Sequence, residues 1–420
     1  MSMATPKDWN VGILSDYAIV KGGKRLPKGE TYSEVRTAYP YIRVTNFENG
    51  SISLNDLRYV TEEIRSHIKR YVISSKDLYV SIAGTLGLVG DVPNELDGAL
   101  LTENAAKIVF NDGSEADKSF YKYFLNAEDA QNHFHQAKGT GGGVPKLALF
   151  RIEETPVLSP PIKEQQKIAA ILTAVDEVIE STQAQINKLK DLKTGLMQEL
   201  LTQGIGHTEF KDSPVGRIPK AWRTSKIQDI AGYITSGSRG WAEYYSKSGA
   251  IFIRIGNLTR EHINFRFNDI VYVNPPDGGE GKRTLVQVGD VLISITADLG
   301  IIGVVNESIG EAYVNQHVSL VRLNDTQLSR WVGHYLAHEN AQKQFTASND
   351  SGAKAGLNLS AIRNLEIALP PKEEREKIVR ALDSVDNDIV NRRNKLSRSM
   401  DIKKALMQDL LTGKVRVKTA

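Results

Sequence analysis

The sequence of 420 residues contains no cysteine. Disulfides, thiolate zinc sites, iron–sulfur clusters and thiol nucleophiles are therefore excluded. Long apolar runs are also missing, because the most apolar stretch, residues 291–305, is shorter than the roughly 18 residues of a membrane span and contains Asp298. No apolar export segment follows Met1. We therefore expect a cytoplasmic protein.

Neither positive nor negative residues are in large excess, because the sequence has 53 Lys and Arg residues and 50 Asp and Glu residues. The net charge of +3 is only a weak indication of an anionic partner. The apolar fraction of 40% is that of an ordinary folded protein. The length predicts two or three domains, each with its own core.

What the chain does contain is an internal repeat at an offset of 210 to 213 residues. Pro6-Lys7-Asp8-Trp9 returns as Pro219-Lys220-Ala221-Trp222, and residues 42–46 return as 253–257. From Pro160 to Thr202 the match to residues 370–412 needs no gap. A duplicated gene explains a repeat of this length, and a short-period solenoid does not.

Each half begins with short β-branched runs between Gly- and Asn-rich turns, and with helical patterns at residues 120–134 and 328–345. We predict an α+β (mixed α/β) domain in each half, at residues 1–159 and 204–369. Long helices with almost no glycine follow at residues 160–203 and 370–413, and a basic tail occupies residues 414–420.

Both helices carry a sustained heptad seam. Its apolar members are Ile168, Leu172, Val175, Ile179, Ile186, Leu189, Leu196 and Leu200 in the first helix, and Ile378, Leu382, Val385, Ile389, Leu396, Leu406 and Leu410 in the second. We expect the two helices to pair as an antiparallel coiled coil with pseudo-twofold symmetry. The alternative is that each helix packs only on its own domain.

Four segments resemble catalytic or ligand-binding motifs, and none of them is complete. Residues 274–277 lack the aromatic residue of an amino-methyltransferase loop and favour a surface turn. Residues 276–282 place their carboxylates too close together for a nuclease and favour a polar hairpin tip. The glycines of 139–143 precede no Gly-Lys-Ser/Thr and favour a mobile loop, and His334 with His338 has no third zinc ligand, which favours an exposed or capping pair. We predict no catalytic or metal site.

The ordered double set of motifs resembles the specificity subunit (HsdS) of type I restriction–modification systems. The resemblance covers nearly the whole chain. It rests on the openings at Trp9 and Trp222, on the Ile-Arg strands at Ile42 and Ile253, on the Pro-Pro helix starts, and on the Leu-Met-Gln-x-Leu-Leu-Thr helix ends at 196–202 and 406–412. Arg375 stands where the first copy has Gln165.

This resemblance implies two target-recognition domains, each reading one half of a bipartite site in double-stranded DNA, separated by the paired helices. It also implies two modification (HsdM-like) subunits docked on the helices, and restriction (HsdR-like) subunits in the full complex. S-adenosylmethionine, ATP and magnesium would be bound by those partners and not by this chain. The chain itself would be a non-catalytic subunit of a DNA methyltransferase and endonuclease.

Polar and cationic side chains in the two domains are the candidates for contacts with bases and phosphates. They are Lys21, Lys24, Arg25, Arg43, Thr45, Asn46, Lys138, Thr140 and Lys146 in the first domain, and Ser236, Ser238, Arg239, Trp241, Arg254, Asn257 and Lys354 in the second. The replacement of Thr45 by Gly256 in the second copy indicates that the half-sites differ.

The charge is unevenly distributed along the chain. Residues 1–159 carry a net charge of −2 and residues 204–369 a net charge of +1, whereas residues 370–420 carry +5. The recognition domains are thus nearly neutral, and we expect the isolated chain to attract phosphates weakly. The modification subunits would then supply much of the nonspecific affinity.

Two other functions remain open on the sequence alone. An enzyme with an atypical methyltransferase or nuclease centre would act on DNA without partners. A coiled-coil adaptor, or a DNA-binding module of another defence complex, would join proteins or bind DNA without choosing a bipartite sequence.

A helix of about 38 residues spans roughly 57 Å, or about 17 base pairs, so its length would measure the spacer between half-sites. Inserting four residues, about one turn, into the first helix should change the spacer length in the methylated sequence. Sequencing of modified bases in a host that expresses the variant complex would measure it. An unchanged spacer would rule out this role for the helix.

Overall fold

The computed structural model describes residues 6–136, 145–237, 239–267, 269–275, 278–347 and 356–418. The chain forms two compact units. Unit 1 comprises residues 1–180 and 397–420, and unit 2 comprises residues 181–396. Within the described ranges, no helix is both long and apolar enough to cross a membrane.

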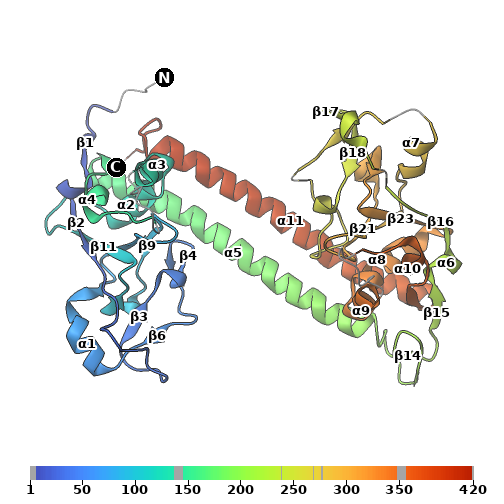
Figure 1. Ribbon diagram of the computed structural model, residues 1–420. Coiled ribbons are helices and arrows are strands. Elements are labelled where there is room, and N and C mark those ends of the chain that lie inside the picture. Colours follow the sequence, from blue (N-terminus) through green and yellow to red (C-terminus); the bar gives the residue numbers. More distant parts are fainter. Residues whose placement is uncertain are drawn as a thin grey trace. The chain divides into compact units, whose positions relative to one another are not determined.

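Two four-stranded sheets form the globular part of unit 1 (Figure 1). The first is antiparallel, whereas the second contains one parallel pair, β3 with β10. The first sheet runs β2 (Ala18–Gly22), β11 (Ala105–Phe110), β8 (Leu78–Ser81), β9 (Val89–Asp91), and the second runs β6 (Arg58–Tyr59), β3 (Pro40–Ile42), β10 (Ala99–Leu101), β7 (Val72–Ile73). β8 is buried on both faces, which explains why its sequence is a continuous apolar run.

Short helices cover these sheets. They are α1 (Glu62–Ile68), α2 (Lys118–Leu125), α3 (Glu128–Gln136) and α4 (Leu149–Glu153). The side chain of Asp117 accepts a hydrogen bond from the backbone N–H of Phe120 at 2.8 Å and so caps α2. α2 and α3 bury Phe120, Tyr121 and Phe134 in the same core as the apolar side chains of the first sheet.

Unit 2 repeats this architecture, as the internal repeat predicted. Its antiparallel sheet runs β16 (Ala231–Ser236), β23 (Val318–Leu323), β20 (Val291–Ser294), β21 (Ile302–Val304), and its mixed sheet runs β17 (Tyr245–Ser246), β19 (Tyr272–Val273), β18 (Ala250–Ile253), β22 (Ala312–Val314). Its helices are α6 (Ile227–Ile230), α7 (Gly279–Thr284), α8 (Ser329–Ala337), α9 (Glu339–Ala347) and α10 (Leu359–Arg363). The parallel pair also recurs, here as β18 with β22.

A strand pair connects the start of each unit's sheet region to the long helix that follows. In unit 1, β1 (Asn10–Ile13) pairs with β12 (Pro156–Ser159), and in unit 2, β15 (Arg223–Lys226) pairs with β24 (Glu366–Leu369). Two shorter pairs are β4 (Phe47–Glu48) with β5 (Ser51–Ile52) and β13 (Phe210–Lys211) with β14 (Ile218–Pro219).

The two long helices are α5 (Ile162–Leu200) and α11 (Lys372–Leu410), each of 39 residues and therefore about 58 Å long. Each begins after its proline pair, as predicted. All fifteen predicted apolar seam residues are buried or half-buried. In each unit an ion pair joins α5 to α11, and the two helices run antiparallel (Figure 1). The predicted antiparallel pairing is confirmed within each unit.

The same lysine–aspartate pair occurs once in each unit, at positions 210 residues apart. In unit 1 Lys403 Nζ lies 2.6 Å from Asp176 Oδ1, and both side chains are about a quarter to a third exposed. In unit 2 Lys193 Nζ lies 2.6 Å from Asp386 Oδ1, and the exposed fractions are only 7% and 0%. Among the described residues the seam is therefore apolar along most of its length, and the ion pair in each unit fixes which residues face each other.

The tryptophan of each domain opening anchors the first turn of the long helix that follows in the same unit. Trp9 Nε1 donates to Glu164 Oε2 at 3.2 Å, and Trp222 Nε1 donates to Glu374 Oε2 at 3.0 Å. The segment that follows the other long helix reaches the same carboxylate, because Arg416 bonds Glu164 at 2.8 Å and His207 lies 2.9 Å from Glu374. The repeated Pro-x-x-Trp motif is thus a packing motif of the helix ends.

A glycine in the left-handed region ends each of these connections. Gly413 has φ 73°, and an added Cβ would lie 2.6 Å from Pro6. Gly204 has φ 67°, and an added Cβ would lie 2.8 Å from Trp222. Both positions therefore require glycine for conformation and for space.

Three expectations need correction. His334 and His338 are buried, with exposed fractions of 0% and 8%, because this face of α8 packs into the core of unit 2, so they are not an exposed pair; of the two, His338 is the C-cap residue of α8. Residues 279–284 form helix α7 and not a hairpin tip, since the glycines of the segment permit a tight helical turn after Gly278, whose φ is 117°. The helical patterns at 120–134 and 328–345 each break into two helices, α2 with α3 and α8 with α9.

Replacing Lys193 by Met should destabilise unit 2 by about 3–5 kcal/mol, because Asp386 would remain buried without its partner. The matched replacement Lys403→Met should cost about 1 kcal/mol or less, because Asp176 keeps access to water. Urea unfolding of the purified variants measures both free energies of unfolding. Equal losses would contradict the different burial of the two pairs.

Unit 2 should lose stability as the pH falls below about 6.5. Burial lowers the pKa of His262, His334 and His338, and for His334 it outweighs the hydrogen bond to Asp383. The unfolded chain therefore binds more protons than the folded chain in this window, and stability rises with pH. A fully buried histidine such as His334 contributes up to about 1.4 kcal/mol per pH unit.

Urea unfolding at pH 7.5 and 5.5, followed by tryptophan fluorescence, measures this dependence. The signal reports mainly on unit 2, which contains Trp222, Trp241 and Trp331, whereas unit 1 contains only Trp9. An equal free energy of unfolding at the two pH values would show that the three histidines titrate alike in the folded and unfolded chain.

Candidate nucleic-acid interface

The repeated Ile-Arg-x-x-Asn segments form the same turn in both units, a short 3-10 helix after a strand, at Val44–Asn46 and Ile255–Asn257. Asn46 Oδ1 accepts from the backbone N–H of Arg43 at 3.0 Å, and Asn257 Oδ1 accepts from that of Arg254 at 2.9 Å. Each asparagine is only 2% exposed. Each buried asparagine side chain therefore stabilises its own turn through this hydrogen bond.

The arginines of these turns are half-buried and extend along the surface of the loop that follows. Arg43 Nη2 donates to the backbone oxygen of Asp56 at 2.8 Å and to its Oδ2 at 2.9 Å. The hydrogen bond from Arg43, with the charge of Arg58, holds the pKa of the Asp56 carboxyl below its usual range. Arg254 Nη2 donates to the backbone oxygen of Asp269 at 3.0 Å. Thr45 is exposed on its turn, and Gly256 occupies that position in unit 2.

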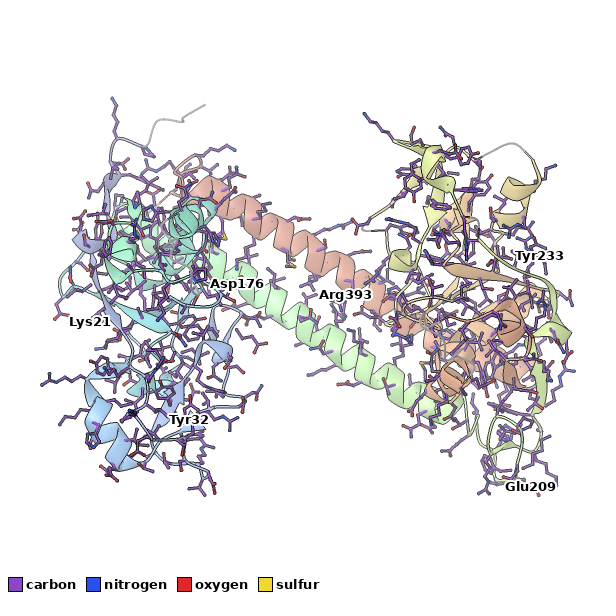
Figure 2. The ribbon with its side chains drawn as sticks, viewed as in Figure 1. Lys21, Tyr32, Asp176, Glu209, Tyr233 and Arg393 are labelled. Atoms are coloured by element: carbon purple, nitrogen blue, oxygen red, sulfur yellow. The ribbon has the colours of Figure 1, made fainter. Side chains whose placement is uncertain are left out.

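In unit 1, the remaining described candidates are exposed lysine and arginine side chains at strand ends. Lys21 lies on β2 (Figure 2), and Lys24 and Arg25 follow it where the chain crosses to β10. Arg25 pairs with Glu103 at 3.0 Å and is 76% exposed. Lys146 is exposed and forms a β-bridge with Ala83, at the end of β8.

In unit 2, Arg239 is exposed just after β16, and Ser236 is half-buried at the end of that strand. Trp241 is 3% exposed and stacks on Phe252 with ring centroids 5.4 Å apart. Trp241 is therefore a core residue of the mixed sheet. Lys138, Thr140, Ser238 and Lys354 lie outside the described residues, as does the whole glycine segment of 139–143.

Sequence reasoning missed a set of tyrosine–cation contacts in residues 24–71 of unit 1. Four cationic side chains lie over tyrosine rings, namely Lys24 over Tyr71 at 5.7 Å, Arg36 over Tyr59 at 5.7 Å, Arg43 over Tyr32 at 6.0 Å and Arg65 over Tyr39 at 5.4 Å. Such contacts occur roughly once per 70–80 residues in proteins, so this segment is enriched in them. The alternation of basic and aromatic residues in the sequence is the signal that could have found it.

In unit 2 the loop after the Arg254–Asn257 turn carries a carboxylate with two cationic partners. Glu261 Oε1 lies 2.6 Å from Lys190 Nζ, and Glu261 Oε2 accepts from Arg393 Nε at 2.8 Å. Burial of the carboxyl opposes ionisation, but the hydrogen bonds from Arg393 and Lys190 outweigh it and lower the pKa of Glu261 to about 2. The ion pairs are therefore present at all physiological pH values.

Among the residues that the structure describes, no group of three or more His, Asp or Glu side chains could hold a metal ion. The two regions that remain prominent are the repeated turns at Val44–Asn46 and Ile255–Asn257, each preceded by an arginine. Both are suited to hydrogen bonding with a polyanion.

The chain is similar in sequence to known proteins. The family model described as "Type I restriction modification DNA specificity domain" matches twice, at residues 6–191 and 219–397. The MjaVIII specificity subunit of a type I restriction enzyme from Methanocaldococcus jannaschii is 24% identical, with 99% of this chain and 95% of that protein covered. The EcoKI specificity subunit from Escherichia coli (strain K12) is 22% identical, with 90% of this chain and 82% of that protein covered.

Solved structures show the same fold. A crystal structure of the S subunit of a type I restriction–modification system from M. genitalium has a TM-score of 0.65 at 13% identity, and covers 100% of this chain and 99% of its own. A chain from a study of complex assembly and conformational transition of the type I system has a TM-score of 0.50 at 19% identity, and covers 98% of this chain and 100% of its own. With the double match of the family model, these findings show that the chain belongs to the type I restriction–modification DNA specificity family.

Proposed function

We propose that this chain is the DNA specificity subunit of a type I restriction–modification complex. The observation that carries the proposal is the double family match, which places one specificity domain over each of two units with the same two-sheet architecture. Unit 1 and unit 2 each read one half of a bipartite target in double-stranded DNA. Because the turns and their surroundings differ between the units, the two half-sites differ in sequence.

The chain chooses the sequence and leaves the chemistry to partner subunits. Two modification subunits bring S-adenosylmethionine, and restriction subunits bring ATP and magnesium. The complex acts in the cytoplasm, where its DNA target lies. This division of labour agrees with the family, whose members named above are specificity subunits of restriction enzymes.

The long helices dock the modification subunits and set the spacing of the half-sites. Leu192 on α5 is 51% exposed and Ile402 on α11 is 54% exposed, and the two residues are 210 positions apart in the repeat. Exposed aliphatic side chains at equivalent positions suit two copies of one partner. Each helix length of about 58 Å corresponds to about 17 base pairs.

Exposed cations of the two units contact the DNA. In unit 1 these are Lys21, Lys24, Arg25 and Lys146, with Thr45 on the turn itself, and in unit 2 the exposed candidate is Arg239. Arg43 and Arg254 join this set, with guanidinium groups that hydrogen bonds to the loop that follows already orient. The sequence adds Lys138, Thr140, Ser238 and Lys354 to the residues that we propose for DNA contacts. Asn46, Asn257, Ser236 and Trp241 contribute by shaping the surface.

A complex reconstituted from this chain and its modification subunit should methylate one bipartite sequence. Random DNA duplexes are methylated with the complex and sequenced for modified bases. We expect enrichment of two short half-sites at one fixed spacing. Methylation that enriches no sequence would instead indicate an adaptor. Methylation or cleavage by this chain alone would indicate an enzyme.

Arg239→Ala tests the site assignment in the same complex. It should lower methylation of the native site by about tenfold or more, because a specific arginine–base contact is worth about 1–3 kcal/mol. Arg223→Ala, which removes an exposed arginine from β15, is the matched control and should have no effect. Native methylation by the Arg239 variant would remove this residue from the interface.

A further inference from the structure

The Arg254–Asn257 turn of unit 2 and the loop that follows it form one closed substructure. The backbone N–H of Arg266 donates to the oxygen of Asn257 at 3.0 Å, and Asn257 Nδ2 donates to the oxygen of Arg266 at 3.3 Å. The loop of residues 258–265 therefore leaves the turn and returns to it. A displacement of the loop must move the turn with it.

The far end of this loop is bound to both long helices within unit 2. Glu261 pairs with Lys190 of α5 at 2.6 Å and accepts from Arg393 of α11 at 2.8 Å. Arg393 is labelled on α11 in Figure 2. The backbone oxygen of Glu261 also accepts from Lys193 Nζ at 3.1 Å.

Buried groups continue the attachment two residues further along the loop. The backbone N–H of Ile263 donates to Asp386 Oδ2 at 3.0 Å, and Asp386 is 0% exposed. Asn264 Oδ1 accepts from Arg330 Nη1 at 2.9 Å, and Arg330 in turn binds Asp383 of α11. Because backbone as well as side-chain atoms are bound, the loop has little freedom to shift on the helices.

The described part of unit 1 shows no equivalent attachment. Its Arg43–Asn46 turn is followed by the β4–β5 hairpin, whose residues Glu48, Asn49 and Gly50 line a cavity of about 280 Å³ together with Asp176 and Lys403 of the long helices. In the part of unit 1 that the structure describes, no hydrogen bond or ion pair joins the 47–52 hairpin to either helix. The two turns are thus alike, but among the residues that the structure describes only the turn of unit 2 is bound, through its loop, to the helix pair.

We propose that Glu261 is a positioning residue for the half-site that unit 2 reads, acting through the loop on the Arg254–Asn257 turn. This inference rests on the proposed function. Removing its charge would leave Lys190 and Arg393 without their shared carboxylate and would loosen the loop. The half-site read by unit 1 is independent of this network.

The test uses the complete complex with its modification subunits. Once the native motif is known, methylation is measured on duplexes with single-base changes in either half-site. Glu261→Gln should lower discrimination by about tenfold in one half-site only, the scale of a lost hydrogen bond to a charged group. Glu261→Asp should retain part of the discrimination. The control Glu48→Gln, on the corresponding hairpin of unit 1, should alter neither half-site.

Equal loss in both half-sites, or no loss, would overturn the inference. If Glu261→Gln lowers the melting temperature of the chain, then Lys190→Met and Arg393→Gln, which each remove one partner, should produce the same one-sided loss. Failure of these two variants to do so would also overturn it. A native complex without any bipartite motif would refute the proposed function instead, so the two failures are distinguishable.

Discussion

The antiparallel contact between α5 and α11 is the interaction on which the rest of each unit depends. Aliphatic seams alone would tolerate a shift of one heptad, because one layer of leucine and isoleucine resembles the next. Charged groups do not tolerate such a shift, since a displaced Asp386 would face apolar side chains without a partner. The Lys193–Asp386 pair in unit 2 and the Lys403–Asp176 pair in unit 1 therefore define the register.

The same contact decides how each domain is attached. Asp176 accepts from Tyr123 of the unit 1 core at 2.8 Å, and Asp386 accepts from the backbone of Ile263 in unit 2. At the other end of each unit, Trp9 and Trp222 bind the first turn of a helix through Glu164 and Glu374. Each globular part is thus bound to its helices at several points, of which these two recur in both units.

Duplication has left the two units alike in architecture and different in detail. His207 takes the place that Arg416 occupies in unit 1, and the buried histidines His262 and His334 belong to unit 2 alone. In unit 2 the loop after the Arg254–Asn257 turn is bound to the long helices. In unit 1 a cavity lies between the hairpin after the Arg43–Asn46 turn and the long helices. These differences leave the shared scaffold intact, because none of them alters the sheets or the helix seam.

The sequence by itself determined the repeat, the α+β class, the two long helices and their seam, because periodicity and self-similarity are properties of residue order. It also determined the family through the ordered motifs. Only the tertiary structure decided that Asn46, Asn257 and Trp241 are internal, that His334 and His338 are buried, and that Glu261 meets Lys190 and Arg393. Burial and contacts between distant residues depend on how the elements pack, and a local pattern of residue types does not contain that information.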